Sequence, residues 1–218
     1  MSDSSATTGE TISKGVINSN VLYDFSFSTM GQEYEWSCWY ACTKIIFQWA
    51  KETGIDGYSP DNVDDQLIAR AFGTKDDLEQ AKINGLDPKK GDFEKLRGAI
   101  GFHGISRSTA AGWDGDALVD ILHDMGPLYW CRKVDQKGGD WTYHAMVIRG
   151  FETNGNGTLT VINPFDDAHF TPPVSKQGAP FPAIDAKFGF KTFKGLLAPA
   201  GSSAEGLALM ALGKPQKT

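Results

Sequence analysis

This chain of 218 residues contains no long apolar run and no block of positive charge, and it has few cysteines. No stretch of about 18 apolar residues occurs, which excludes a membrane-spanning helix. Lys and Arg number 21 against 27 Asp and Glu, so the net charge is −6, and the basic residues form no cluster. This argues against nucleic acid as a main partner. The remaining composition, 40% hydrophobic and 22% charged, is typical of a folded soluble protein.

Cysteine is scarce, with only Cys38, Cys42 and Cys131. A small, odd number of cysteines argues against a disulfide framework. Cys38 and Cys42 are four residues apart, so on a helix they would be neighbours but usually too distant to bridge. We therefore expect three free thiols.

The two ends of the chain differ in composition from its middle. The first 15 residues are small and polar, without the charged start and apolar stretch of a secretory signal peptide. We expect a flexible segment over residues 1–20, one folded domain over residues 21–197, and a C-terminal tail over residues 198–218. The short apolar run at 207–212 is also compatible with a packed helix. The protein is expected to stay in the cytosol of its producer or to leave it by a leaderless route.

The spacing of the apolar residues, together with the turn and capping residues between them, predicts an α+β fold. Helices are expected in the first half and an antiparallel sheet in the second. The expected helices cover residues 38–50, 76–83 and 92–100, with two more beginning near Ser59-Pro60-Asp61 and after Asp114. The expected strands cover residues 128–134, 142–152, 158–162 and 187–193, with a hairpin signal at residues 154–157.

Cys38 is the best candidate nucleophile because it stands at the start of its predicted helix, where the helix dipole favours a thiolate. Cys42 and Cys131 fall among apolar neighbours and are expected in the core. A lone cysteine is more often a small buried hydrophobe, so the assignment of Cys38 depends on its companions.

His144, Asn163 and Gln32 are those companions. His144 lies within a predicted strand and is a candidate base, and Asn163 ends the next strand, where its amide oxygen can orient the imidazole. Phe165 would shield that hydrogen bond. Gln32 stands six residues before Cys38, and its amide can join the Cys38 N–H as a donor to an oxyanion. Taken alone, His144 is also consistent with a core histidine, Asn163-Pro164 with a turn and Gln32 with a solvated loop residue.

The order Gln32, Cys38-Trp39, His144, Asn163 resembles the papain-like cysteine peptidases. Within that superfamily the chain is similar to the bacterial leader-peptidase and effector-type group. The matching segments are Gly126-Pro127-Leu128, the stretch HAMVIRG beginning at His144, and Val161-Ile162-Asn163-Pro164. The resemblance covers about residues 30–166. It implies a helical N-terminal lobe whose cysteine helix packs on an antiparallel sheet.

The resemblance also implies the chemistry. A Cys38–His144–Asn163 triad would hydrolyse peptide bonds with Gln32 in the oxyanion site, and neither a metal nor another cofactor is needed. Asp166 and Asp167 are rivals of Asn163 as the third member. The implied partners are a protein or peptide substrate and, if the chain is a leaderless bacterial toxin or effector, a cognate immunity protein.

Two other functions are compatible with the same residues. A cell-wall peptide amidase would use the same triad, although no basic wall-binding module is seen. A non-catalytic or zinc-binding module would use the three cysteines and His144, but one pair of cysteines four apart on a helix suits a structural zinc site poorly.

Overall fold

A computed structural model of the chain describes residues 15–17, 20–86, 91–105, 110, 112–135, 141–153, 156–165, 184–197 and 209–212. The helices and helical turns are α1 (Cys38–Glu52), η1 (Pro60–Asn62), α2 (Val63–Leu67), η2 (Ile68–Phe72), α3 (Lys75–Asn84), α4 (Asp92–Ile100), α6 (Gly115–Met125) and α7 (Phe190–Leu197). The strands are β1 (Gly15–Ile17), β2 (Asn20–Asp24), β3 (His103–Gly104), β4 (Leu128–Asp135), β5 (Trp141–Glu152), β6 (Thr158–Asn163), β7 (Ile184–Gly189) and β8 (Leu209–Ala211). The predicted α+β class is confirmed.

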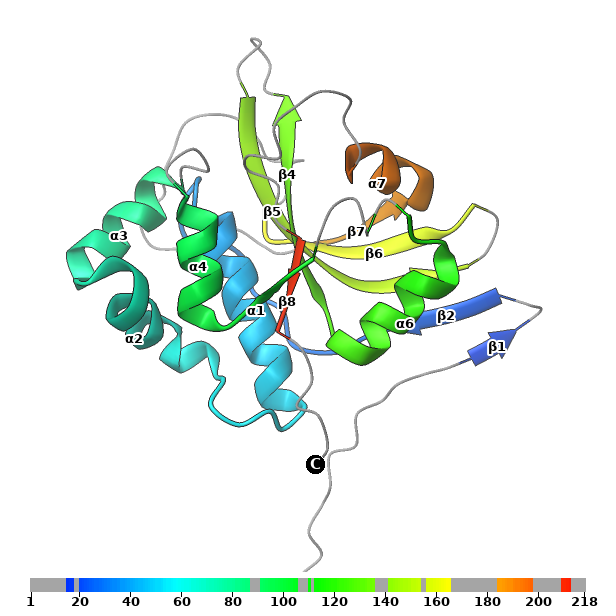
Figure 1. The fold of residues 1–218 in the computed structure, drawn as a ribbon, viewed down its shortest axis with the longest axis horizontal. Helices are drawn as coiled ribbons and strands as arrows, with labels where there is room; N and C mark the ends of the chain where they lie inside the picture. Colours follow the sequence, from blue (N-terminus) through cyan, green and yellow to red (C-terminus); the bar gives the residue numbers. More distant parts are fainter. Residues whose placement is uncertain are drawn as a thin grey trace, which may run out of the picture.

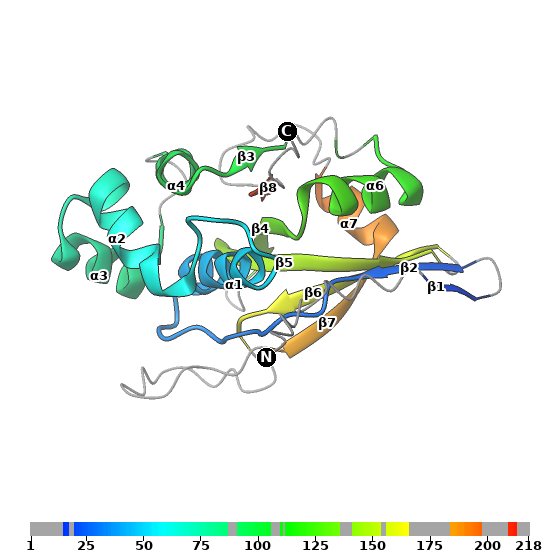
Figure 2. The same ribbon diagram turned by 90° about the horizontal axis from the view of Figure 1, so that it is seen from below.

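The sheet is antiparallel and is built around β5, its longest described strand. One edge of β5 pairs with β4 along its first part and with β2 along its last three residues. The other edge pairs with β6, but only from Val147 onward. Figure 1 shows α2, α3 and α4 gathered on one side of the molecule, with α1 between them and the strands. In the turned view, α4 and α6 lie above β5, whereas β6 and β7 lie below it (Figure 2).

Local signals explain most of the helices. Asp114 caps α6, accepting a hydrogen bond from the Ala117 N–H at 2.9 Å, and Gly126 follows its end with a φ of 82°. Ser59 caps the turn that leads into α2 and accepts from the Asp61 N–H. The helix predicted over residues 92–100 has those bounds in the structure. Caps of this kind are encoded within a few residues, which is why the sequence reveals them.

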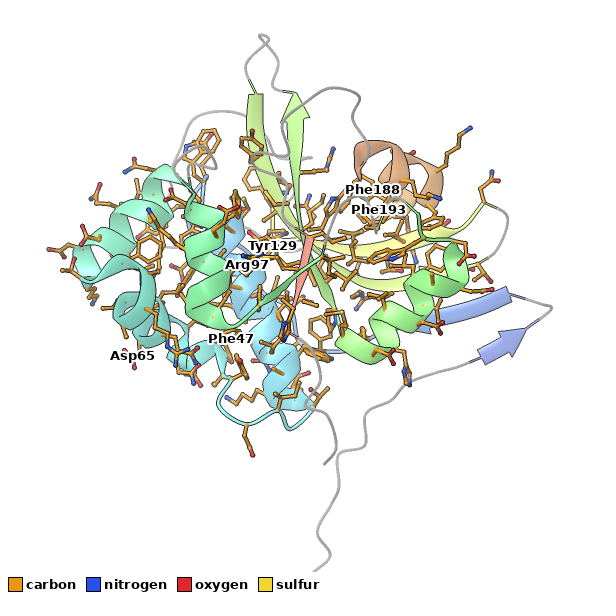
Figure 3. All side chains as sticks on the ribbon, in the orientation of Figure 1. Phe47, Asp65, Arg97, Tyr129, Phe188 and Phe193 are labelled. Carbon is orange, nitrogen blue, oxygen red and sulfur yellow. The ribbon has the colours of Figure 1, made fainter. Side chains whose placement is uncertain are left out.

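α1 crosses the centre of the molecule and is buried on almost all sides. Ile45, Ile46 and Phe47 are fully buried, as are Tyr129 and Leu128 of β4 opposite. Figure 3 shows Phe47 and Tyr129 in the interior, whereas Asp65 lies at the outer edge of the helical lobe. Burying side chains of this size on several faces holds α1, and therefore its first residue Cys38, in a fixed place against the sheet.

Three segments differ from the expected elements. The strand expected over residues 187–193 ends at Gly189, and a helix begins at Phe190. Helical spacing places Phe190 and Phe193 side by side, and Phe193 meets Trp130 edge-on at 5.2 Å, next to Phe188 (Figure 3). Residues 209–211, expected in a tail or helix, form β8 and pair with β4. Residues 15–17, expected to be flexible, pair with β2.

No helix within the described residues combines the length and apolarity required to cross a membrane.

A buried lysine, Lys82, connects the helices α1, α2 and α3. Lys82 is only 3% exposed, and its Nζ lies 2.9 Å from a Glu79 oxygen and 3.2 Å from an Asp64 oxygen. The ammonium also lies 4.1 Å from the centre of the Tyr40 ring, on the face of α1. Tyr40 in turn donates a hydrogen bond to Asp64. The cluster therefore connects α1, α2 and α3 through one cation.

Replacing this lysine with methionine is expected to lower the free energy of unfolding by about 2 kcal/mol, because two carboxylates lose their buried cation. Lys95→Met is the matched control, since Lys95 also pairs with an acid three residues earlier, Asp92, but is 59% exposed. That variant should stay within about 0.5 kcal/mol of the wild type. Urea denaturation measures both, and equal losses in the two variants would contradict the assigned role of Lys82.

Candidate active site

Cys38 is the first residue of α1, and it is here that the sheet and the helical lobe meet. The first turn of α1 contains no acidic residue, so nothing on the helix itself offsets the positive end of its dipole. Cys38 is 7% exposed, compared with 0% for Cys42 and 1% for Cys131. Of the three free thiols, it is the one with some access to solvent.

The start of α1 is docked against β5 just before the point where β5 begins to pair with β6. Within the described residues, the pairing of β6 with β5 begins at Val147, so residues 143–145 precede it on that edge. The Ala145 N–H donates to Cys38 Sγ at 3.4 Å, and the Tyr143 carbonyl lies 4.0 Å from the same sulfur. Main-chain contacts on both sides of His144 thus place the sulfur beside the histidine.

The surroundings of Cys38 favour its ionised form. Burial alone would raise the pKa of the thiol, but the His144 ring hydrogen-bonds to the sulfur and adds its charge, and the Ala145 and Trp39 N–H groups also point to it. Together these interactions hold the pKa of Cys38 below its ordinary value. At Cys42 burial acts without such donors, and the pKa of that thiol is raised well above its usual range. Cys38 is therefore suited to act as a nucleophile and Cys42 is not.

His144 is held by Asn163 on the side away from the sulfur. Its Nε2 lies 2.6 Å from the Asn163 Oδ1, which also accepts the Phe165 N–H at 3.1 Å. Because this oxygen already accepts one N–H, it acts as an acceptor toward the imidazole as well, so the proton lies on Nε2. The other ring nitrogen, Nδ1, is then left to serve Cys38. Asn163 is 5% exposed and Phe165 7%, so the pair is largely shielded from water.

Gln32 lies beside this group, but its amide is engaged elsewhere. Its Nε2 donates to the Tyr34 carbonyl at 2.9 Å and to the Glu35 carbonyl at 2.8 Å. Its Oε1 is buried and has no hydrogen-bond partner among the described residues. The side chain is 1% exposed and is not a solvated loop residue. In this resting arrangement neither N–H of the amide is free for an oxyanion, and that predicted role stays a prediction.

Of the four residues singled out by sequence, Cys38, His144 and Asn163 therefore form one connected chain of contacts, and Gln32 flanks it. Sequence reasoning missed the main-chain groups of Tyr143 and Ala145, whose role depends on where along β5 the pairing with β6 begins. Asp166 and Asp167, the rival third members, lie outside the described residues. Among the residues that the structure does describe, no group of three or more His, Cys, Asp or Glu side chains is arranged to hold a metal ion.

The lowered pKa of Cys38 predicts how its alkylation depends on pH. The rate should rise as the thiol deprotonates, with a midpoint below that of a free cysteine, and should fall only when the pH drops through that lowered value. Cys42 and Cys131, which are buried, should remain unmodified in the folded protein. Iodoacetamide labelling across a pH series, with mass mapping of the three cysteines, measures this. A midpoint at or above that of free cysteine would contradict it.

Comparison with known protein families agrees with this geometry. The sequence matches the family described as papain-like cysteine protease AvrRpt2 over residues 17–172, which includes all four predicted site residues. No curated protein matches the chain.

Proposed function

Because the chain belongs to the family of the papain-like cysteine protease AvrRpt2, and is thus a cysteine peptidase, we propose that it hydrolyses peptide bonds in proteins through Cys38, His144 and Asn163. The observation that carries the assignment of residues is the unbroken line from sulfur to imidazole to amide oxygen. His144 hydrogen-bonds to the Cys38 sulfur, and its Nε2 lies 2.6 Å from Asn163 Oδ1.

In the proposed mechanism the Cys38 thiolate attacks the carbonyl carbon of the scissile bond. The developing oxyanion lies at the start of α1, where the Cys38 N–H lacks an intrahelical acceptor and can donate to it. Protonated His144 transfers its proton to the leaving amine, which leaves a thioester on Cys38. His144 then removes a proton from water, and the resulting attack releases the acid and restores the Cys38 thiolate beside protonated His144.

Asn163 supports both halves of this cycle. Its oxygen accepts from the Nε2–H in each protonation state of the ring, so the ring keeps its orientation while Nδ1 gains and loses a proton. Phe165 contributes its own N–H to the same oxygen, which prevents the amide from turning over. The third member of the triad thus acts as a positioning group and is not required to change its charge.

Incubation of the purified protein with a denatured proteome tests the proposed activity. We expect new N-termini with the wild-type protein and none with Cys38→Ala, because alanine removes the nucleophile and keeps the helix. Cys131→Ala is the matched control, since it removes a thiol that takes no part in the mechanism. Equal cleavage by the wild type and Cys38→Ala would refute the proposal. Purified peptidoglycan, assayed alongside, distinguishes the cell-wall alternative by loss of turbidity.

The predicted toxin or effector role remains part of this proposal. It requires delivery from the producing cell and an immunity protein that blocks the Cys38 site. An immunity protein of this kind would protect Cys38 from iodoacetamide when mixed with the protease in equal amounts.

A further inference from the structure

We propose that Lys82 is a positioning residue for the Cys38 nucleophile. It acts by holding the two carboxylates to which Tyr34 and Tyr40 donate hydrogen bonds. These tyrosines lie four residues before and two residues after Cys38 in the sequence. The inference rests on the proposed function, since it concerns how the nucleophile is held during the reaction. It goes beyond the stability that the buried lysine contributes.

The cluster around Lys82 has the same arrangement on each of its two sides. Glu79 accepts from the ammonium with Oε1 at 2.9 Å and from the Tyr34 hydroxyl with Oε2 at 3.4 Å. Asp64 accepts from the ammonium with Oδ2 at 3.2 Å and from the Tyr40 hydroxyl with Oδ1. Each carboxylate therefore connects the lysine to one tyrosine, and the lysine is the group that both sides share.

The place of Tyr40 on α1 makes this cluster relevant to the nucleophile. Successive residues of a helix are about 100° apart, so Tyr40 points about 200° away from Cys38. Cys38 lies against β5, where the Ala145 N–H donates to its sulfur at 3.4 Å. Tyr40 lies against α2 and α3, with the centre of its ring 4.1 Å from the Lys82 ammonium. The first turn of α1 is thus held between the sheet and the lysine cluster, which opposes rotation of the helix about its axis.

A small rotation of α1 would be enough to affect the reaction. Side chains extend about 5–6 Å from the axis of a helix, so a rotation of about 10° moves the Cys38 sulfur by about 1 Å. A misplacement of about 1 Å at a reacting group can lower a rate by roughly a hundredfold. Tyr34 acts on the segment before the helix, because its hydrogen bond to Glu79 fixes the loop that leads into α1.

The charge of Lys82 keeps both carboxylates in place. Burial alone would lower the pKa of this lysine, but the hydrogen bonds and charges of Glu79 and Asp64 raise its pKa above the ordinary value, so the cation persists. Without the cation the two carboxylates would repel each other. Since the Glu79 side chain is 33% exposed and that of Asp64 41%, at least one of them would turn toward water and release its tyrosine.

Lys82→Met tests the inference at a temperature where circular dichroism shows the variant to be folded. We expect kcat for protein hydrolysis to fall at least about tenfold with little change in KM, because a displaced sulfur slows the chemical step. Alkylation of Cys38 by iodoacetamide, in which the sulfur bonds to the methylene carbon as iodide leaves, should also slow. Its pH midpoint should rise, because the hydrogen-bond donors to the sulfur become misaligned. A wild-type kcat and midpoint in the folded variant would overturn the inference.

Leu118→Ala separates positioning of the nucleophile from a general loss of stability. Leu118 is fully buried and belongs to α6, which lies on the other side of α1 from α2 and α3 (Figure 1). This variant should melt at a lower temperature as well. While folded, it should hydrolyse protein and label at Cys38 like the wild type. An equal rise of the labelling midpoint in Leu118→Ala and Lys82→Met would refute a specific role for the lysine.

The two tyrosines provide a test that does not depend on folding of the lysine variant. Tyr34→Phe and Tyr40→Phe each remove one hydroxyl, and each should lower kcat and raise the labelling midpoint, by less than the loss of the lysine does. Tyr58→Phe is the matched control, since Tyr58 also packs against α1, edge-on to Phe47 at 4.9 Å, but away from the first turn. It should behave like the wild type. Wild-type rates in both Tyr34→Phe and Tyr40→Phe would contradict the inference.

Adding Tyr40→Phe to Lys82→Met shows whether the lysine acts through the tyrosine. If it does, the double variant should lose little more activity than Lys82→Met alone, whereas losses that multiply would show that the two residues act independently and would overturn the inference. Failure of the proposed function has a different signature, namely a wild-type protein that neither hydrolyses proteins nor labels selectively at Cys38.

Discussion

Replacing His144 with alanine is expected to lower kcat/KM for protein hydrolysis at least about a thousandfold and to slow the alkylation of Cys38 near neutral pH. The histidine has two roles in the proposed mechanism, and both are lost together. Without the ring, burial raises the pKa of Cys38, and the interactions that remain come only from the Ala145 and Trp39 N–H groups. The leaving amine also loses its acid. A fluorogenic or protein substrate gives the first rate and iodoacetamide labelling the second.

His123→Ala is the control for this variant. His123 is an exposed residue on α6 that pairs with its neighbour Asp124. It carries the same imidazole group as His144 but does not lie beside Cys38. We expect its hydrolysis and labelling rates to match the wild type. The proposed mechanism fails if His144→Ala retains wild-type hydrolysis, or if its Cys38 labels with an unchanged pH midpoint.

The candidate site was largely predictable because each member carries a local signal. Cys38 follows the loop that starts its helix, and Asn163 stands at a strand end before Pro164. The hairpin signal after β5 indicates that β5 and β6 pair, which brings the end of β6 near His144. The resemblance to papain-like peptidases then supplies the order of the residues. Pairing of neighbouring strands is a short-range property, and such properties can be deduced from sequence.

The contacts of Gln32 and Lys82 could not be predicted in this way. The amide of Gln32 is directed by the carbonyls of Tyr34 and Glu35, whose positions depend on the turn that precedes α1. Lys82 lies on a helix with little apolar character, and its burial arises only when α1, α2 and α3 come together. Sequence alone identifies a lysine as a surface residue by default, since burial of its charge needs partners from elsewhere in the chain.

β8 shows the same difficulty on the scale of an element. The run at residues 207–212 is too short to distinguish a helix from a strand by periodicity. The structure of residues 209–211 is determined by β4, whose outer edge pairs Leu128, Tyr129 and Trp130 with residues 211, 210 and 209. β3 then pairs with the other side of β8. A segment near the C-terminus thus completes the sheet between two elements from the middle of the chain, beyond the part that matches the family.

Removal of residues 207–218 is therefore expected to unfold the protein or lower its melting temperature by more than 10 °C. Leu209, Met210 and Leu212 are each at most 5% exposed, and burying side chains of this kind contributes about 1.5–3 kcal/mol apiece. Their sum approaches the whole stability of a typical domain, about 5–15 kcal/mol. The loss also uncovers an apolar strand edge at β4, which favours aggregation. Thermal unfolding followed by circular dichroism, with light scattering for aggregation, measures both effects.

A shorter deletion and a point substitution test whether pairing of β8 is the cause. Removal of residues 213–218 leaves every described contact of β8 in place, so its melting temperature should stay close to that of the full chain. Met210→Asp keeps the length but puts a carboxylate at a position that is 2% exposed and paired with Tyr129, and it should destabilise the fold nearly as much as the long deletion. If the variant without residues 207–218 has the same melting temperature as the full chain, β8 contributes nothing to the stability of the sheet. If Met210→Asp also hydrolyses substrate normally at 37 °C, then the edge of β4 needs no cover and the catalytic group is held by α1, β5 and β6 alone.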